Sequence, residues 1–407
     1  MISFKEAQKL IEEHCPKPNE ELLFTSGALG RVNSRDLKSP ISLPVFDNSA
    51  MDGFLLRSED TSTATAENPV FLKIKGAIRA GDGDALALVD QETYRVMTGA
   101  AMIQNADAVI AKEKAVVKED LLVVSSPVLK GLNVRYSGEE LKKGELILPK
   151  GSVINPGTIG FLASMGIDRI YVYRVPKISL IATGSELVAA GHPLKRGKIY
   201  DSNTPMIKAA LEEMGIRAVF IRKAMDEPKT IKKILSFALK ESDILILMGG
   251  VSVGDYDFVK ELLQEAGVKT IFWNVSQKPG KPLYFGKKAE SLVFGLPGNP
   301  ASVFTCFYEY VYPAIRMFMG HENPYLRSQV MKIAGSFKPD FEKTLFIKGK
   351  TNRDNTVSPL RHQKSHMLSS LCEANSFMVI PPSQGEIKHG EETLVHSLPY
   401  ALERVEP

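Results

Sequence analysis

The chain has 407 residues, of which 44% are hydrophobic and 24% charged, and its formal net charge is +4. This length exceeds what one ordinary hydrophobic core holds, so two to four domains are expected. The small positive excess disfavours a nucleic-acid-binding protein, which would show a concentrated basic face. The three cysteines are far apart, fit neither a zinc site nor a disulfide framework, and favour a reduced, cytoplasmic setting.

Residues 1–14 predict an amphipathic helix with charges throughout, and they lack the apolar segment of a signal peptide. No run of about 18 apolar residues occurs in the chain, so no membrane-spanning helix is expected. These features favour a multidomain enzyme with neither a nucleic acid nor a membrane as its partner.

Residues 40–144 combine short apolar runs with glycines and turns, and this texture predicts a small β-rich domain. Its predicted strands are residues 70–78, 107–117 and 121–128. The flanking segments, residues 21–39 and 145–170, mix strand and loop signals, and their pairing with each other stays open.

Strands and helices alternate from residue 172 onward, which predicts an α/β domain with a doubly wound, mostly parallel sheet. Such sheets bind ligands beyond the carboxyl ends of their strands. The predicted strands are residues 177–183, 217–224, 243–250 and 270–275, with short ones near Leu283 and Leu292. The predicted helices are residues 204–214, 228–240, 257–267 and a long one from Pro300. The segment after residue 323 returns to β character and predicts a separate small β domain, with runs at residues 330–337, 344–350, 376–382 and 392–398.

The loop GGVSVGDYD (residues 249–257) lies between a predicted strand and a predicted helix. Its glycines let backbone N–H groups approach a ligand, and the helix N-terminus favours an anion. Asp255 and Asp257 would repel an anion unless a divalent cation lay between them, so the loop suggests phosphate with Mg²⁺. The alternative is an ordinary helix N-cap, for which Asp and Gly are well suited.

Two further loops carry charged residues. Glu186, in ATGSEL (residues 182–187), either binds a metal or stays on the surface as a first-turn residue. Lys278 and Lys281, in QKPGKPL (residues 277–283), suit a phosphate or another oxyanion, or they belong to a solvated turn.

The loop GLPGNPAS (residues 295–302) predicts Asn299 as a helix N-cap and Pro300 as the first helical residue. The unpaired N–H groups of that first turn bind either an anionic substrate or water. The β-rich region adds three polar segments that are not diagnostic singly: PVFDNSAMDGF (residues 44–54) with Asp47 and Asp52, RVMTGA (95–100) with Thr98, and NVRYSGEEL (133–141) with Arg135 and Glu140.

Taken together and in this order, these motifs resemble the molybdopterin molybdenumtransferases, the family that includes the E domain of gephyrin. The resemblance runs from about residue 44 to 380 and also includes RAGDG (79–83), NADAVI (105–110), YDSN (200–203) and SSLCEAN (369–375). Two departures stand out. Glu140 occupies a position where the family usually has Asp, and Asn274 one where some members have Lys.

The resemblance implies four domains and a homodimer. It implies a doubly wound molybdopterin-binding domain, a β-rich insertion domain, a small elongated connecting domain and a C-terminal β-barrel-like domain. The active site would lie in a cleft between the doubly wound domain of one subunit and the β-rich domain of the other. The implied bounds are 20–39 with 145–170 for the connecting domain, 40–144 for the insertion, 1–19 with 171–324 for the doubly wound domain, and 325–407 for the barrel.

The family chemistry implies adenylated molybdopterin and molybdate as substrates, with molybdenum cofactor and AMP as products. The implied cofactor is Mg²⁺, with Glu186 and Asp257 as its ligands. The implied catalytic residues are Asp52, Glu140, Glu186, Asp226 and Asp257. The implied substrate-binding residues are Thr98, Arg135, Thr183, Ser252, Lys278, Lys281, Pro297, Asn299, Pro300 and Ser369.

Two other functions are compatible with the motifs. A gephyrin-like dimeric scaffold would have little need of so many acidic and basic loop residues. A molybdopterin adenylyltransferase would share the doubly wound domain but would not need the β-rich and C-terminal regions. Such an adenylyltransferase is also a possible partner protein.

Overall fold

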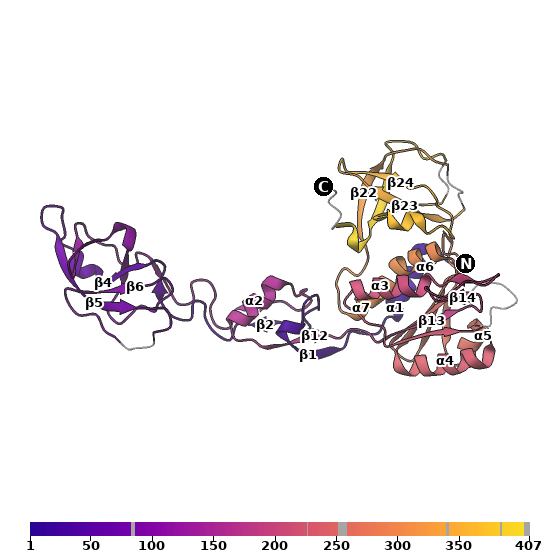
Figure 1. Cartoon of the computed structure of the whole chain (residues 1–407), viewed down its shortest axis with the longest axis horizontal. Coiled ribbons are helices and arrows are strands. Elements are labelled where there is room, and N and C mark those ends of the chain that lie inside the picture. The colour runs from indigo at the N-terminus through magenta and orange to yellow at the C-terminus, as the bar shows by residue number, and fades with distance from the viewer. Residues whose placement is uncertain (83–85, 226, 251–258, 339–341, 383–384, 403–407) are drawn as a thin grey trace.

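The computed structural model describes the chain except for residues 83–85, 226, 251–258, 339–341, 383–384 and 403–407. The molecule is elongated, as Figure 1 shows. The β-rich region lies at one end, the doubly wound domain and the C-terminal barrel lie at the other, and a narrow connecting region joins them. Residues of the two ends are therefore far apart within one chain.

The doubly wound domain contains a six-stranded sheet in the order β16–β13–β17–β21–β20–β18. The first four strands run parallel to one another, and β20 is antiparallel to both β21 and β18. The prediction of a mostly parallel sheet is confirmed. The strands are β13 (Ile178–Thr183), β16 (Phe220–Ala224), β17 (Ile244–Met248), β18 (Lys269–Trp273), β20 (Tyr284–Lys288) and β21 (Ser291–Leu296).

Helices cover both faces of this sheet, because each face has its own apolar cluster. One cluster includes side chains of α1, α3 and the helical segment after residue 300, and the other includes side chains of α4 and α5. The N-terminal helix α1 therefore packs on this domain, although the β-rich region follows it in the chain. The helices are α1 (Phe4–His14), α3 (Asn203–Glu213), α4 (Pro228–Glu241), α5 (Val259–Glu265), α6 (Pro300–Cys306) and α7 (Tyr312–Phe318).

Between α6 and α7 the chain forms a π-helical turn, Phe307–Val311, and all five of its residues are buried. The long helix predicted from Pro300 is thus one continuous helical segment with a wider turn in its middle. A π turn shifts the side chains that follow it relative to a regular α-helix.

The connecting region is built from both flanks of the insertion, which settles the pairing that the sequence left open. Strand β1 (Glu20–Phe24) pairs with β12 (Arg169–Tyr173), and β2 (Leu37–Lys38) pairs with β11 (Leu146–Leu148). Helix α2 (Pro156–Ser164) contributes Leu162 to the apolar core of this region.

The β-rich region has a six-stranded sheet in the order β7–β4–β6–β5–β9–β8. The single strand predicted at residues 107–117 is wrong, because a 3₁₀ turn (Lys112–Lys114) divides it into β7 and β8, which lie at opposite edges of the sheet. Since so few residues join the two edges, the sheet must curl. The strands are β3 (Asn48–Ser49), β4 (Gly53–Leu56), β5 (Val70–Ile78), β6 (Glu92–Val96), β7 (Ala108–Ala111), β8 (Val116–Lys118), β9 (Leu121–Val124) and β10 (Val134–Arg135).

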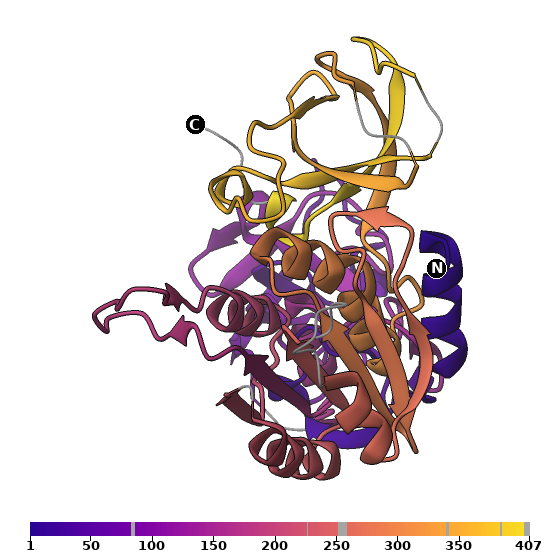
Figure 2. The same ribbon diagram turned by 90° about the vertical axis from the view of Figure 1, so that its right-hand side faces the viewer.

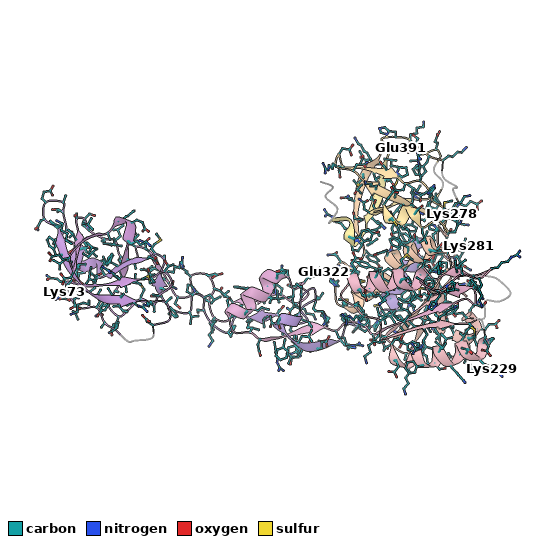
Figure 3. The ribbon with its side chains drawn as sticks, in the orientation of Figure 1. Lys73, Lys229, Lys278, Lys281, Glu322 and Glu391 are labelled. Carbon is teal, nitrogen blue, oxygen red and sulfur yellow. The ribbon has the colours of Figure 1, made fainter. Side chains whose placement is uncertain are left out.

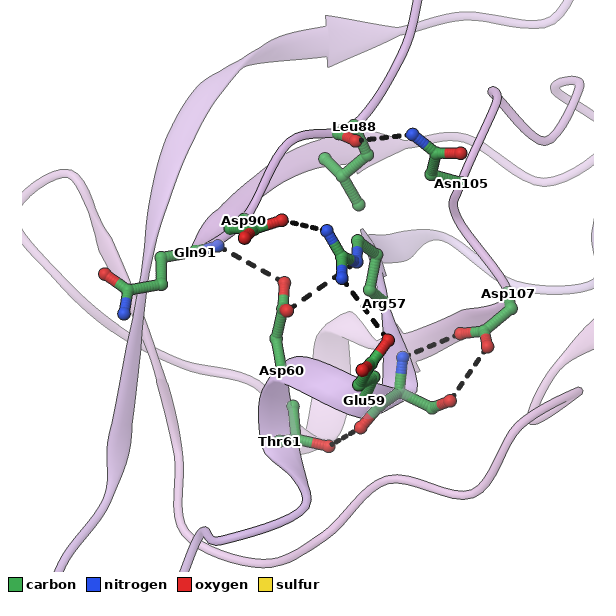
Figure 4. A network of polar contacts seen from close by, with 10 residues as sticks. Arg57, Glu59, Asp60, Thr61, Leu88, Asp90, Gln91, Asn105 and Asp107 are labelled. Carbon is green, nitrogen blue, oxygen red and sulfur yellow. Dashed lines mark hydrogen bonds and ion pairs between the residues drawn. The ribbon is translucent and has the colours of Figure 1, made fainter.

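A polar network at the end of β4 braces this sheet (Figure 4). Arg57 pairs with Asp90 and lies 3.6 Å from the Asp60 carboxylate. Asp107 accepts hydrogen bonds from the Ser58 backbone N–H (2.7 Å) and hydroxyl (2.8 Å). Arg57 thus engages Asp60 and Asp90, and Ser58 engages Asp107, so the network serves the fold.

The C-terminal region forms a closed five-stranded barrel, since β23 pairs with both β24 and β25. A short strand from the doubly wound domain, β19 (Gln277–Lys278), extends the barrel by pairing parallel to β23. The two domains are therefore joined by backbone hydrogen bonds. The barrel strands are β22 (Arg327–Ile333), β23 (Thr344–Thr351), β24 (Thr356–Pro359), β25 (Ser376–Ile380) and β26 (Glu392–Ser397).

All three cysteines carry free thiols, with Cys306 buried and Cys372 exposed. Among the described residues, no helix is both long and apolar enough to cross a membrane.

Candidate functional site

A cavity of about 670 Å³ lies at the carboxyl ends of β13, β17 and β21. This is the position at which open parallel sheets bind ligands. Predicted residues at its wall are Thr183, Glu186, Pro297, Asn299 and Pro300. Tyr200 and Asn203 of the YDSN motif also line it, and the residues that the sequence did not single out include Met248, His366 and Leu368.

Glycines let the turn after β17 approach the end of β13. Gly249 and Gly250 have φ of +89° and +67°, a conformation that favours glycine. A Cβ on Gly249 would lie 2.8 Å from the Thr183 carbonyl oxygen, and one on Gly250 would lie 2.9 Å from the Thr183 Oγ1. The glycines therefore permit two loops to meet at the floor of the cavity.

Glu186 is exposed beside this cavity, and its carboxylate folds back over Gly184, because a Cβ there would meet both carboxylate oxygens within 2.8 Å. No group of three or more acidic, histidine or cysteine side chains that could hold a metal occurs among the described residues. The predicted residues Asp226, Ser252 and Asp257 lie outside the described residues. The predicted metal site thus stays a prediction, of which Glu186 is the described part.

The chain between Glu186 and Asn203 forms an arm that projects from the domain (Figure 2). Strands β14 (Leu187–Val188) and β15 (Ile199–Tyr200) form its base, and all residues from 191 to 200 are exposed. Ile199 and Tyr200 also line the cavity. The arm therefore extends one wall of the cavity into solvent.

A second cavity, of about 410 Å³, adjoins the first and shares Pro282, Pro297, Asn299 and His366 with it. Lys278 and Lys281 line it, and Figure 3 places both where the doubly wound domain meets the barrel. Two more lysines complete it, Lys343 and Lys364. Four lysines therefore line this cavity, and lysine side chains are suited to hold an anion.

The barrel contributes the loop that carries Lys364, Ser365 and His366, and sequence reasoning missed it. The Ala301 backbone N–H donates to the Ser365 carbonyl at 3.0 Å, and the Asn299 side-chain amide donates to the Ser365 hydroxyl at 3.1 Å. A KSH triplet gave no signal beyond polarity. Its value becomes visible only when the loop lies against the start of α6.

Lys348 holds this loop from within the barrel. Its side chain is 3% exposed, and its Nζ donates to the carbonyls of His362 (2.8 Å) and Met367 (3.3 Å). Burial lowers the pKa of Lys348 to about 8. A buried amine thus sets the course of a loop that lines both cavities.

Two details of the predicted residues differ from expectation. Asn299 is the N-cap residue and Pro300 begins α6, but the Asn299 side chain makes no capping hydrogen bond, because it turns to Ser365 instead. Ser369 lines neither cavity, and its hydroxyl lies 3.2 Å from the His362 Nδ1.

The β-rich region gathers a separate polar cluster. Asp52 accepts hydrogen bonds from the Thr98 backbone N–H and hydroxyl, both at 2.8 Å, and its other oxygen lies 3.2 Å from the Lys112 Nζ. These contacts lower the pKa of Asp52 to about 2, and the two hydrogen bonds from Thr98 have the largest effect. Lys112 follows β7 directly, and the sequence did not mark it.

Arg135 and Glu140 belong to the same end of the molecule. Arg135 lies on β10, opposite Asn48 of β3, which places NVRYSGEEL beside PVFDNSAMDGF. Both side chains are exposed, and the Glu140 backbone N–H donates to the Leu43 carbonyl at 3.0 Å. The structure brings the three motifs of the β-rich region together, and it separates them from the two cavities (Figure 1).

Comparison with known families finds three matches along the chain. Residues 2–166 match a family described as the MoeA N-terminal region (domain I and II), residues 179–317 a probable molybdopterin binding domain, and residues 332–398 the MoeA C-terminal region (domain IV). Together these matches span nearly all of the chain.

Individual relatives match over nearly their whole length. The chain is 32% identical to a molybdopterin molybdenumtransferase of Haemophilus influenzae, covering 99% of this chain and 100% of that protein. It is 33% identical to one from Staphylococcus aureus, covering 96% and 94%. A crystal structure of a molybdopterin biosynthesis MoeA protein from Pyrococcus horikoshii superimposes with a TM-score of 0.79 at 28% identity, covering 98% of this chain and all of that one.

Proposed function

Because this chain belongs to the molybdopterin molybdenumtransferase family, we propose that it inserts molybdate into adenylated molybdopterin, releasing AMP and forming molybdenum cofactor. The observation that carries the proposal is the pair of adjoining cavities. One lies at the strand ends, where a nucleotide-linked substrate fits, and the other presents four lysines to a tetrahedral oxyanion.

Each cavity contributes a different part of the reaction. Lys278 and Lys281 hold the oxygens of molybdate with charge-assisted hydrogen bonds. Thr183, at the wall of the first cavity, faces the phosphates of the substrate. Since the two cavities share Pro297 and Asn299, the oxyanion and the phosphoanhydride lie next to each other, which the transfer requires.

Glu186 is suited to hold Mg²⁺ together with Asp257. Its carboxylate is exposed beside the cavity, and no ion pair engages it among the described residues. Carboxylate oxygens are the protein ligands that Mg²⁺ prefers. The bound ion would offset negative charge on the substrate phosphates.

The active enzyme is proposed to be a homodimer in which the β-rich region of one subunit covers the cavities of the other. The β-rich region, which carries Asp52, Thr98 and Arg135, lies at the opposite end of the chain from the doubly wound domain (Figure 1). Large apolar side chains are exposed within the same motifs, as expected of a contact surface: Val45 at 58%, Phe46 at 51%, Met51 at 39%, Met97 at 43% and Tyr136 at 47%.

Molybdate-dependent AMP release tests this function. The purified chain is incubated with adenylated molybdopterin and Mg²⁺, with and without molybdate, and AMP is quantified by chromatography. AMP that forms only with molybdate supports insertion. Pyrophosphate release from ATP with molybdopterin would instead identify an adenylyltransferase. If neither AMP nor pyrophosphate forms, the scaffold role is favoured.

A further inference from the structure

A buried polar pair lies directly behind the lysine loop. Gln277 is 1% exposed and Tyr310 is fully buried, and the Tyr310 hydroxyl donates to the Gln277 side-chain oxygen. Burying an amide and a phenol is unfavourable unless each is hydrogen-bonded. Two apolar side chains would fill the same space at less cost, so the pair calls for a reason beyond packing.

The Gln277 side chain spans the loop that carries the two lysines. Its Nε2 donates to the Gly280 carbonyl at 3.1 Å. Gln277 precedes Lys278 and Gly280 precedes Lys281, so this one hydrogen bond ties together the backbone on which both ammonium groups are mounted. A second hydrogen bond joins the two ends of the loop, since the Val275 backbone N–H donates to the Lys281 carbonyl at 2.9 Å.

The loop is also pressed against α6, which leaves it little freedom to move. A Cβ on Gly280, whose φ is +89°, would lie 2.5 Å from the Cys306 Sγ and 2.8 Å from the Gln277 Nε2. The Gln277 Nε2 also lies 3.6 Å from the Cys306 Sγ. Burial raises the pKa of the Cys306 thiol far above its usual value, so this sulfur acts here as packing and not as a nucleophile.

The π-helical turn explains how Tyr310 reaches this place. Within Phe307–Val311, Tyr310 points to Gln277 while its neighbour Glu309 contacts the His396 Nδ1 of the barrel at 2.9 Å. Phe4 packs edge-on against the Tyr310 ring, with the centroids 5.8 Å apart. One wider helical turn therefore holds both the lysine loop and the barrel strand β26, and such turns often occur at functional sites.

We infer that Tyr310 and Gln277 form a positioning clamp that sets the spacing of Lys278 and Lys281 for a tetrahedral oxyanion. The inference rests on the proposed role of these lysines in binding molybdate. Tyr310 lines neither cavity. Gln277 is among the residues that line the lysine cavity, but it is only 1% exposed, and both residues act through the loop. Precise support behind binding residues is worth about tenfold or more in affinity.

The test separates positioning from simple stability by means of Tyr310→Phe, Gln277→Met and the double variant. Affinity for sodium molybdate is measured by isothermal titration calorimetry on the full chain, and stability by urea unfolding. Tyr310→Phe removes the hydroxyl that donates to Gln277, and Gln277→Met removes the amide that donates to Gly280. Each single variant should weaken molybdate binding about tenfold. The double variant removes both polar groups, so it should regain stability while binding stays weak, because Gly280 still lacks its tether.

Tyr308→Phe is the matched control. Tyr308 is a buried tyrosine of the same π turn, but its hydroxyl donates to the Glu213 carboxylate at 3.2 Å, away from the lysine loop. It should lose stability and keep the molybdate affinity of the unmodified chain. Molybdate affinity that is unchanged in Tyr310→Phe, restored in the double variant or equally weakened in Tyr308→Phe would overturn the clamp.

The outcome is distinguishable from a failure of the proposed reaction. Molybdate binding is measured without nucleotide substrate, so a chain that releases no AMP still reports on the clamp. Weakened binding in the clamp variants would support the clamp even if AMP release were absent. A complete lack of molybdate binding by the unmodified chain would overturn it.

Discussion

Asp52 shows how two neighbouring residues, Thr98 and Lys112, define the protonation state of one side chain. Two hydrogen bonds from Thr98 and the nearby Lys112 ammonium favour its carboxylate form and lower its pKa to about 2. Asp52 is therefore charged throughout the neutral pH range. A group of this kind can accept hydrogen bonds or attract a cation, but it is a poor general acid.

The first prediction concerns Thr98→Val, which removes one of these hydrogen bonds and keeps the side-chain shape. The pKa of Asp52 should rise from about 2 towards its ordinary value of 3.8 without reaching it, because the backbone N–H and Lys112 remain. NMR titration of the carboxyl carbon measures this. Thr65→Val is the control, since its hydroxyl bonds Asn68 instead. An unchanged Asp52 pKa would show that the Thr98 hydroxyl contributes nothing.

The sign of the stability effect follows from the direction of the shift. The folded pKa of Asp52 lies below the unfolded one, so its ionised form stabilises the fold above about pH 4. That contribution is lost as pH falls towards 2. The Thr98→Val variant should therefore lose less stability on acidification than the unmodified chain does.

Lys348 gives a second prediction with the opposite pH window. Burial lowers its folded pKa from 10.5 to about 8, so between these values the unfolded chain binds the extra proton and stability rises with pH. Lys348→Met removes this dependence. From pH 8 to 10.5 the unmodified chain should gain up to roughly 3 kcal/mol of unfolding free energy relative to the variant. Urea unfolding at several pH values measures it, and a constant difference would contradict the argument.

At the scale of elements, the ends of strands decide the geometry of the cavity. β13 and β17 are parallel neighbours, so the turns that follow them must pass within contact distance. Only glycine at positions 249 and 250 leaves room for Thr183. The close approach of Gly249 and Gly250 to Thr183 therefore depends on both turns, the one after β13 and the one after β17.

The third prediction is that Gly249→Ala lowers the unfolding free energy by about 1–3 kcal/mol, because a positive φ and a backbone contact both oppose a Cβ. The contact is the Thr183 carbonyl oxygen at 2.8 Å. Gly298→Ala is a control for stability from the same cavity, since its Cβ would have only the Gly249 Cα at 4.0 Å. Equal stability of both variants in urea would argue against the steric reason.

At the scale of the whole molecule, the elongated shape separates two sets of polar groups that the proposed reaction needs together. The connecting region, with its paired strands β1–β12 and β2–β11, holds the β-rich region away from the cavities. A second copy of the chain supplies the missing half under the proposed two-fold arrangement.

The fourth prediction is that two inactive variants complement each other. Asp52→Asn damages the β-rich half and Lys281→Ala the lysine cavity, so each homodimer should be inactive. After subunit exchange, each heterodimer holds one site with two intact halves, and about a quarter of the unmodified activity should return. Mixing Asp52→Asn with Arg135→Ala, both in the β-rich half, is the control and should restore nothing. Failure of the first mixture to recover activity would sink the shared site.

Much of the fold was predictable from the sequence, because local patterns are governed by local forces. Buried strands such as Ile244–Met248 are continuous apolar runs, and Asn299–Pro300 marks a helix start whatever surrounds it. The charged loops around Lys278 and Glu186 were visible for the same reason, since such residues follow strand ends at regular intervals along the chain.

Only the tertiary structure decided which of these loops meet. The pairing of β1 with β12, the closure of the barrel and the placing of Ser365 against Asn299 are contacts between residues far apart in sequence. Their energies depend on packing and burial, which no local pattern encodes. The same holds for Tyr310 and Gln277: neither residue type suggests a partner, and a wider helical turn and a two-residue strand bring them together.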